Sequence, residues 1–321
     1  MKQTDNCVIH TQGLSKSFGE VQALQNVDLK VPRHSIFGFL GPNGAGKTTL
    51  MKILLGLARP TSGSGTIFGH DIVAQSVAVR ERIGYLPQHP RFIEQMTARE
   101  NLDFTAKFFF SGPQSKIRER CDEMLELVGL AEKANRPIKG FSGGEKQRLG
   151  IALAQVNYPD LLILDEPASA LDPLGRLSVL EIMERLRKYT TIFYSTHILD
   201  DVQRVSDTVA ILNRGQMVVS GPIEQILNGK DGIVYSLAVK GAVTQLDRQL
   251  AELPWVTHTA LSHHNGTSLL QVSVSDEASA EKDLLRQVLS DPAITVTKFS
   301  RKKYELEEVF MEIVKGDGHD R

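Results

Sequence analysis

The chain has 321 residues, of which 41% are apolar and 23% charged, and its 37 basic and 38 acidic residues leave a formal net charge of −1. This composition is typical of a soluble globular protein of one large or two smaller domains. It excludes a global basic field that would attract nucleic acid or acidic lipid, and no apolar run approaches the roughly 18 residues that a membrane span needs. The two cysteines, Cys7 and Cys121, predict neither a disulfide framework nor a zinc site. With a polar N-terminus that lacks a signal core, we expect a cytoplasmic protein.

The first segment has the alternating pattern of strands, which we predict at residues 8–14 and 23–31. Phe18 lies between them, in a predicted turn at 17–20. From the pattern alone, Phe18 fits two interpretations equally well. It is either a core residue or a flat surface on which an adenine base stacks.

A phosphate-binding motif follows a short apolar strand at 35–40 and precedes a predicted helix at 50–57. The glycines let the backbone curl so that N–H groups point inward, at the positive end of the helix. Lys47 can reach the β- and γ-phosphates of a nucleotide, and the Thr48 hydroxyl can hold Mg²⁺. The motif comprises Gly41, Pro42, Asn43, Gly44, Ala45, Gly46, Lys47, Thr48 and Thr49.

The chain then continues through elements of less distinct chemistry. We predict a turn at 59–66, strands at 66–68 and 83–88, and a helical segment at 97–131. Thr97 and Glu100 have the spacing of a capping box, which begins a helix. Gln88, at the end of its strand, is unremarkable by itself, because most such glutamines are solvated loop residues.

A second glycine-containing segment begins a helix that runs to Val156. Ser142 and Glu145 again have capping-box spacing, but Gly143 and Gly144 occupy the first turn. Each glycine there costs about 1 kcal/mol relative to alanine, so a compensating role is expected. Bare N–H groups at a helix N-terminus form an anion site open to a phosphate from outside, and a flexible helix start is the equal alternative.

Two acids stand at the end of the next apolar strand, 161–164, where ligands bind in open α/β sheets. Asp165 can hold Mg²⁺ through water, and Glu166 can orient and deprotonate an attacking water. We prefer this interpretation to an acidic surface loop, because the phosphate loop demands a Mg²⁺ acid on a neighbouring strand.

A turn at 169–173 leads into a predicted helix at 176–188 and then a strand at 191–197. His197 stands just past the end of that strand. A lone histidine there is usually structural, but a third polar strand end near the phosphates makes His197 a candidate hydrogen-bond donor to a γ-phosphate. Residues 209–220 predict a hairpin with a four-residue turn.

In this order, the motifs resemble the ATP-binding subunit of an ABC transporter over residues 7 to about 229. They match the Walker A loop, the Q-loop glutamine, the LSGGQ signature, Walker B, the D-loop and the switch histidine, which lie at 41–49, Gln88, 142–145, 161–166, 169–172 and His197. The resemblance implies an α/β P-loop NTPase of ABC ATPase type, with a RecA-like core, an antiparallel β subdomain and a helical subdomain at about 97–158. It implies ATP and Mg²⁺ as ligands.

The resemblance also assigns roles to single residues. Gln88 would contact Mg²⁺ and, with Glu166 and His197, serve catalysis, and Phe18 stands where the family places its adenine-stacking aromatic. The signature departs from the family pattern, with Phe141 for leucine and Glu145 for glutamine. We expect function to survive, because the phosphate contacts come from Ser142 and backbone N–H groups, those of Gly143 and Gly144 included.

The same resemblance implies a head-to-tail pair of subunits, in which the signature of one copy caps the γ-phosphate held by Walker A of the other. The chain carries one set of motifs, so a second copy or a homologous subunit is needed for two ATP sites. The ABC domain is predicted at 1–229.

The remaining residues, 230–321, predict a small α+β domain in the order βαββαβ, the ferredoxin-like plan. A last helix at 304–314 has one apolar face, and the basic cluster 301–303 before it is either solvated or in contact with lipid headgroups. This tail is similar to the C-terminal extension of bacterial export ATPases of the daunorubicin-resistance type, and we expect it to be regulatory or to stabilise a dimer.

We therefore expect an ATPase that drives an exporter, held on the inner face of the cell membrane by a separate integral membrane permease. The alternative is a soluble ABC ATPase that acts on ribosomes or DNA. That alternative is disfavoured because such proteins usually carry two ATPase halves or long coiled coils, and because the net charge of −1 offers no attraction for nucleic acid.

Overall fold

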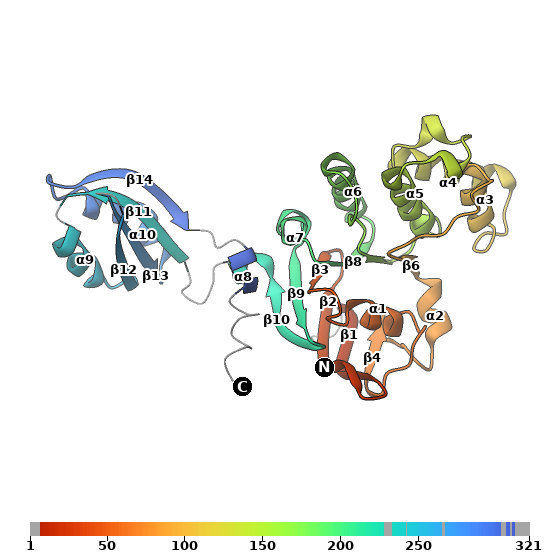
Figure 1. Cartoon of the computed structure of the whole chain (residues 1–321), viewed down its shortest axis with the longest axis horizontal. Helices are drawn as coiled ribbons and strands as arrows, with labels where there is room; N and C mark the ends of the chain where they lie inside the picture. The colour runs from red at the N-terminus through yellow and green to blue at the C-terminus, as the bar shows by residue number, and fades with distance from the viewer. Residues whose placement is uncertain are drawn as a thin grey trace. The chain divides into compact units, whose positions relative to one another are not determined.

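The computed structural model describes residues 7–227, 233–241, 243–264, 267–302, 306–308 and 310–311. The chain divides into two compact units, Met1–Ile223 and Glu224–Arg321, each with its own secondary structure (Figure 1). The predicted joint at 228–232 lies outside the described residues. Among the described residues, no helix is both long and apolar enough to cross a bilayer.

A six-stranded sheet forms the centre of the larger unit, in the order β10-β9-β3-β8-β7-β6. Every residue of β3, β7 and β8 is buried, as a parallel sheet covered on both faces requires. β8 lies between β3 and β7, so the prediction that the acidic strand neighbours the phosphate-loop strand is wrong by one strand. The parallel strands are β3 (Ile36–Leu40), β6 (Ile83–Leu86), β7 (Leu161–Asp165), β8 (Thr191–Thr196) and β9 (Thr208–Asn213), and β10 (Gln216–Pro222) is antiparallel to β9.

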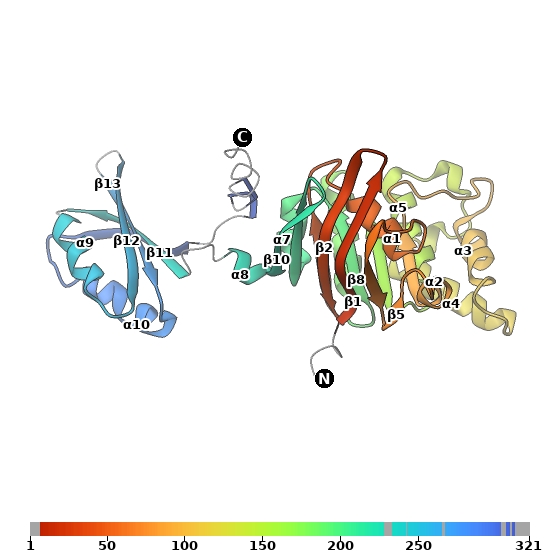
Figure 2. The same ribbon diagram turned by 90° about the horizontal axis from the view of Figure 1, so that it is seen from below.

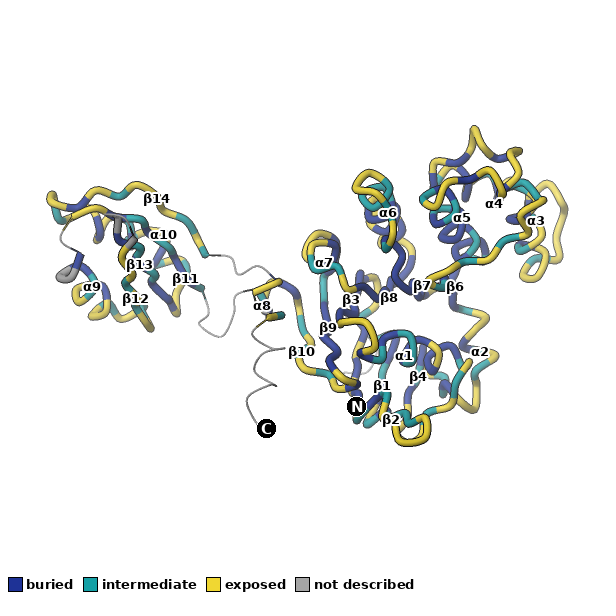
Figure 3. Tube along the Cα trace, in the orientation of Figure 1, coloured by how far each residue is buried: buried dark blue, intermediate teal, exposed yellow. Residues whose placement is uncertain are grey.

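A second, antiparallel sheet lies across one face of this core (Figure 2). Its order is β2-β1-β4-β5, with β1 at Cys7–Phe18, β2 at Val21–Pro32, β4 at Ser62–Ile67 and β5 at His70–Asp71. Helix α1 (Lys47–Leu54) shares one apolar core with residues of both sheets, among them Leu50, Leu29 and Phe39. The core accounts for the dark strands and helix faces in the tube of Figure 3.

The turn predicted at 59–66 is wrong from residue 62 onward, where the chain is strand β4. Gly63 meets the backbone of Gly13 on β1 so closely that an added Cβ would lie 2.3 Å from the Gly13 carbonyl oxygen. The glycine therefore serves close approach of two backbones, which the sequence does not distinguish from a turn.

The remaining helices cover the other face of the core sheet and form a separate cluster. α6 (Pro173–Leu186) and α7 (Leu199–Val205) lie on the face away from α1 (Figure 1), and a short α2 (Ser76–Glu81) precedes β6. α3 (Ala98–Ala106), α4 (Gln114–Leu127) and α5 (Gly143–Gln155) pack against one another within the predicted helical segment.

The helical segment predicted at 97–131 contains two helices, α3 and α4, which residues 107–113 separate. Pro113 has no N–H group and becomes the N-cap of α4, with Gly112 before it. The capping box of Thr97 and Glu100 at the start of α3 is confirmed.

The smaller unit has the predicted βαββαβ order, and its four strands pair antiparallel in the order β12-β13-β11-β14. Its own apolar core joins the sheet to both helices through residues such as Leu237, Leu246 and Leu284. The elements are β11 (Ile233–Lys240), α9 (Val243–Ala251), β12 (Val256–His264), β13 (Thr267–Val274), α10 (Glu277–Val288) and β14 (Thr295–Lys302); α8 (Ile223–Leu227) precedes them.

The end of the chain is described in part. Residues 306–308 and 310–311 are helical, and the rest of the helix predicted at 304–314 lies outside the described residues. In the basic cluster, Arg301 is paired with Glu277 at the start of α10, so it is not simply solvated. Lys303 also lies outside the described residues.

Candidate nucleotide-binding site

The phosphate loop connects β3 to α1, and the helix begins at Lys47, three residues earlier than predicted. Gly46 is the N-cap of α1 with a left-handed backbone, φ 111°. A Cβ on Gly46 would lie 2.5 Å from the Ala23 carbonyl oxygen, and one on Gly41 would lie 2.4 Å from that of Leu212. Glycine is therefore required at 41 and 46 by neighbouring backbone, in addition to the phosphate that the motif predicts.

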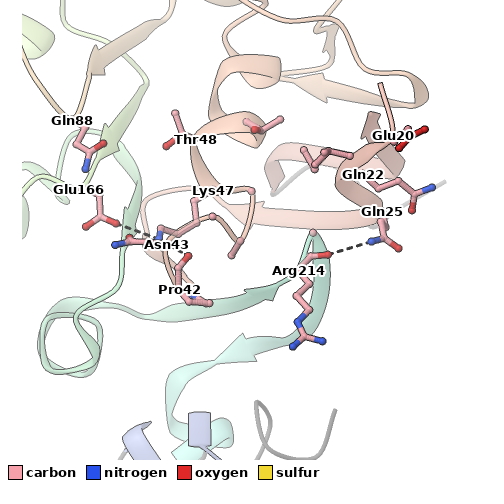
Figure 4. Close-up of a pocket in the computed structure, with 17 residues that line it drawn as sticks. Glu20, Gln22, Gln25, Pro42, Asn43, Lys47, Thr48, Gln88, Glu166 and Arg214 are labelled. Atoms are coloured by element: carbon pink, nitrogen blue, oxygen red, sulfur yellow. Dashed lines mark hydrogen bonds and ion pairs between the residues drawn. The ribbon is translucent and has the colours of Figure 1, made fainter. Parts of the chain in front are cut away.

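A pocket of about 730 Å³ opens beside this loop, within the volume range of small-molecule sites (Figure 4). It takes in eight of the nine predicted loop residues, all except Gly41, and also Gln88 and Glu166, which come from distant parts of the chain. The lining residues are Glu20, Val21, Gln22, Ala23, Gln25, Pro42, Asn43, Gly44, Ala45, Gly46, Lys47, Thr48, Thr49, Gln88, Glu166, Arg214 and Gly215.

One wall of the pocket comes from the β1–β2 and β9–β10 hairpins, at residues such as Val21 and Arg214 that were not predicted to belong to the site. Arg214 and Gly215 form the turn between β9 and β10, with φ of 46° and 80° as a type I′ hairpin requires. The turn is tied to β2, since the Gln25 amide group donates to the Arg214 carbonyl oxygen over 3.2 Å (Figure 4). No sequence motif marks these residues, because their position depends on pairing between distant strands.

The structure brings together two of the three predicted Mg²⁺ ligands, Thr48 and Asp165, and the third, Gln88, lines the same pocket as Thr48. The Thr48 hydroxyl, in the first turn of α1, donates to Asp165 Oδ2 at the end of β7 over 3.0 Å. Asp165 is 1% exposed. A hydroxyl and a carboxylate are hard oxygen ligands of the kind that Mg²⁺ uses alongside substrate phosphates. These residues therefore fit the ion that the motif implies.

Glu166 lies between two other predicted residues. Its Oε1 is 3.3 Å from Lys47 Nζ (Figure 4), and its Oε2 is 2.9 Å from His197 Nδ1. The carboxylate is buried, whereas the His197 side chain is 46% exposed at the end of β8. Lys47 Nζ also donates to the Gly41 carbonyl oxygen over 2.6 Å. A cation, a carboxylate and an imidazole from separate elements thus meet beside the pocket, which Lys47 and Glu166 line and His197 does not.

The contact with Glu166 constrains what His197 can do. A neutral imidazole that donates from Nδ1 to the carboxylate keeps an unprotonated Nε2, which only accepts hydrogen bonds. Donation from Nε2 to a phosphate would therefore require the imidazolium form, or loss of the Glu166 contact.

Ser195 is a residue of the site that sequence reasoning missed. Its hydroxyl, fully buried in β8, donates to Asp165 Oδ1 over 2.6 Å and accepts from the Glu166 N–H over 3.0 Å. A serine inside an apolar strand carries no motif. The available signal was its place two residues before His197, on a strand whose polar end was already implicated.

The signature segment has the predicted local structure. Ser142 is the N-cap of α5, its Oγ accepts from Glu145 N over 3.2 Å, and Glu145 Oε2 accepts from Ser142 N over 2.7 Å. Ser142 and Gly143 are exposed and Gly144 is half-buried. None of these three lines the 730 Å³ pocket, so a single chain does not bring the signature to its own phosphate loop.

Phe18 belongs to β1, and the turn follows it at Gly19–Glu20. Its side chain is 55% exposed, so the interpretation of Phe18 as a core residue is wrong. Lys16 Nζ lies 4.8 Å from its ring centroid. The ring is not among the pocket residues, although Val21 and Gln22 of the same hairpin are. A role in stacking adenine remains a prediction.

The chain is similar to known proteins in sequence and in structure. Residues 24–169 match the family model described as ABC transporter. The chain is 38% identical, over 96% of its length and 99% of that protein, to an uncharacterized ABC transporter ATP-binding protein, YxlF, of Bacillus subtilis. It is 32% identical, over 98% of its length and 94% of that protein, to the daunorubicin/doxorubicin resistance ATP-binding protein DrrA of Streptomyces peucetius.

Among solved structures, the dimeric post-hydrolysis state of the ATP-binding cassette MJ0796 bound to ADP and phosphate is similar, with a TM-score of 0.61 and 26% identity. The similarity covers 67% of this chain and 98% of that one. The structural similarity thus covers about two thirds of this chain, whereas the sequence relatives match almost all of it.

Proposed function

The chain belongs to the ATP-binding proteins of ABC transporters, which are ATPases, and we propose that it binds ATP with Mg²⁺ in the 730 Å³ pocket and hydrolyses it to drive export through a separate membrane permease. The observation that carries the proposal is the convergence of Lys47, Thr48 with Asp165, and Glu166 with His197 at one end of one sheet. We propose export as the direction of transport because the chain is similar over almost its whole length to DrrA, an ATP-binding protein of daunorubicin and doxorubicin resistance.

Each of these groups has a task that its contacts support. Lys47 would bind the β- and γ-phosphates, with Gly44–Gly46 supplying backbone N–H groups. Glu166 would orient a water and accept its proton, and His197 would hold the Glu166 carboxylate in place. Thr48, Asp165 and Gln88 would hold Mg²⁺, which supplies charge neutralisation at the phosphates.

The exposed signature is the reason to propose a dimer. Ser142, Gly143 and Gly144 offer an anion site with no anion from their own chain. In a head-to-tail pair, this site on one copy would close over the phosphates held by Lys47 of the other. The related cassette that binds ADP and phosphate is dimeric, which supports this arrangement.

Exposed aromatic side chains support a surface for the permease. Phe104, Phe108 and Phe109 at the end of α3 are 47%, 73% and 49% exposed. Phe109 also lines an apolar pocket of about 420 Å³ with Tyr85 of β6, the strand that ends just before Gln88. A partner bound here would contact the chain a few residues from Gln88, which lines the nucleotide pocket. We therefore propose that this partner holds the chain at the inner face of the membrane.

The substitution Glu166→Gln tests the proposed function. It keeps the size of the side chain but removes the proton acceptor, so the variant should bind ATP, lose nearly all ATPase activity and accumulate as an ATP-bound dimer in size-exclusion chromatography. Normal turnover would exclude Glu166 as the base. Lys47→Ala, as a companion, should lose most ATP binding, and unaltered affinity would contradict the loop assignment.

Isolation of the chain from native membranes tests the partner. Copurification with a multi-helix membrane protein that stimulates ATPase activity is the expected result. Copurification with ribosomes or DNA instead would favour the alternative of an ABC ATPase without a permease.

A further inference from the structure

The first turn of α5 carries a carboxylate whose two oxygens have separate partners. Glu145 Oε2 accepts from the Ser142 N–H, which closes the capping box. Glu145 Oε1 is paired with Lys133 Nζ. The Glu145 side chain is only 9% exposed, whereas that of Lys133 is 47% exposed. The hydrogen bond and charge of Lys133 hold the pKa of the Glu145 carboxyl below its usual range, against the opposing effect of burial.

Lys133 reaches Glu145 from another part of the helical cluster. It ends a short 3-10 helix, Ala131–Lys133, that follows α4, and its N–H donates to the Leu130 carbonyl oxygen over 3.0 Å. Glu145 lies twelve residues further along the chain. The pair therefore joins the segment after α4 to the start of α5 by a charge contact.

A second capping box in the same chain shows what capping alone requires. At α3, Glu100 Oε2 accepts from the Thr97 N–H over 2.7 Å, the same length as at α5. Glu100 is exposed, and the described part of the chain places no lysine or arginine in an ion pair with it. A capping box can therefore close without a cation, and Glu145 differs from Glu100 in being buried and paired with a lysine.

The first turn of α5 is part of the anion site of the proposed dimer, where a phosphate would bind. An anion and a glutamate at the same helix N-terminus compete for the same positive field, and the repulsion between them grows where water is excluded. We propose that Lys133 is a positioning residue of the signature site: it neutralises Glu145 and holds it in the capping box, so that Ser142, Gly143 and Gly144 can accept the γ-phosphate of a nucleotide bound by a second copy. This inference rests on the proposed dimer.

The test compares four variants in the Glu166→Gln chain, in which ATP-bound dimers accumulate. We would measure the ATP concentration at half-maximal dimer formation by sedimentation velocity. Lys133→Met should raise that concentration on the order of three- to tenfold, because Glu145 is left unneutralised beside the phosphate. Glu145→Gln should change it less than about twofold, since a glutamine oxygen still closes the capping box.

The double variant decides between positioning and general support of the fold. With Glu145→Gln present, Lys133→Met should have almost no further effect, because no charge remains to be neutralised. As a matched control, Lys116→Met breaks an exposed ion pair with Glu119 on α4, 2.6 Å long, and should leave dimer formation unchanged. ATP affinity of the monomer, measured by calorimetry, should be equal in all variants, because Lys133 does not line the pocket.

Either of two results would overturn this inference without affecting the proposed dimer. In the first, Lys133→Met forms dimers at the same ATP concentration as Lys116→Met. In the second, the double variant remains as impaired in dimer formation as Lys133→Met. Thermal unfolding monitored by circular dichroism shows whether a variant is misfolded. A Lys133→Met chain that unfolds at a lower temperature than its parent and has a reduced ATP affinity as a monomer also counts against a positioning role. If the Glu166→Gln parent stays monomeric with saturating ATP, the proposed dimer fails first, and this inference fails with it.

Discussion

Asp165 and Glu166 make different contacts because the backbone changes direction between them. In an extended strand, successive side chains point to opposite faces. β7 ends at Asp165, and Glu166 has a left-handed backbone with φ 52°, an uncommon conformation for a residue with a side chain. As a result, Asp165 accepts a hydrogen bond from Thr48, while Glu166 forms an ion pair with Lys47. Both carboxylates thus contact the phosphate loop.

Ser195 supports both acids, and its removal should be felt in stability and in activity. Ser195→Ala leaves the buried Asp165 carboxylate one hydrogen bond short, which should lower the free energy of unfolding by about 1–3 kcal/mol. ATPase activity should fall on the order of tenfold, because Asp165 loses the partner that orients it. Urea denaturation and a steady-state ATPase assay measure the two effects.

Ser169→Ala is the control for Ser195→Ala. Its hydroxyl donates over 3.0 Å to the Glu166 carbonyl oxygen at a partly buried position, and it touches neither carboxylate. Its effect on stability should stay below about 1 kcal/mol. Equal effects of the two substitutions would show that Ser195 has no special part in placing Asp165.

At the scale of elements, the loop between β3 and α1 is shaped by its neighbours as much as by its own glycines. Gly46 lies against Ala23 of β2, and Gly41 against Leu212 of β9. Gly44 also has a positive φ, 81°, but no atom outside its chain neighbours lies within 4 Å of an added Cβ. The loop thus contains Gly44, which is needed for its conformation, Gly41, which is needed for space, and Gly46, which is needed for both.

Alanine at Gly44 and at Gly46 should separate the need for a left-handed backbone from the need for space. Gly44→Ala should lower the free energy of unfolding by about 1 kcal/mol, the cost of a left-handed alanine. Gly46→Ala should cost at least about 2 kcal/mol and lose ATP binding, because the new Cβ would also displace the Ala23 backbone. Urea denaturation and ATP calorimetry on both variants provide the comparison, and indistinguishable stabilities would contradict the close packing at Gly46.

At the scale of the whole molecule, each unit has a core of its own. The core that joins α1 to two sheets lies within the larger unit, and that of β11–β14 with α9 and α10 lies within the smaller one. The predicted nucleotide, metal and signature residues all come from the larger unit. We therefore expect ATP binding to depend on that unit alone.

Deletion of residues 233–321 tests this division. The shortened chain should fold and bind ATP with an affinity close to that of the full chain, because its core is intact. We expect its ATP-dependent dimerisation or its ATPase rate to change, in keeping with a regulatory or dimer-stabilising role of the smaller unit. Unchanged dimerisation and rate, measured by sedimentation and ATPase assay, would remove that role.

The features that depend on local chemistry could be predicted from the amino-acid sequence. The glycine loop, the capping boxes of Thr97 and Ser142, and the buried strand before Asp165 are encoded by neighbouring residues, so pattern and spacing located them. The predicted βαββαβ order of the smaller unit also follows from local periodicity.

Which distant segments meet could be seen only in the folded protein. The tertiary structure placed β8 between β3 and β7, and so put Ser195 against Asp165. It placed β9 on the other side of β3, and so put the Arg214 turn beside the phosphate loop. It also paired Lys133 with Glu145. Strand order, and ion pairs between residues far apart in the sequence, depend on how whole helices and strands pack. They cannot be predicted from the residues that neighbour each position in the chain.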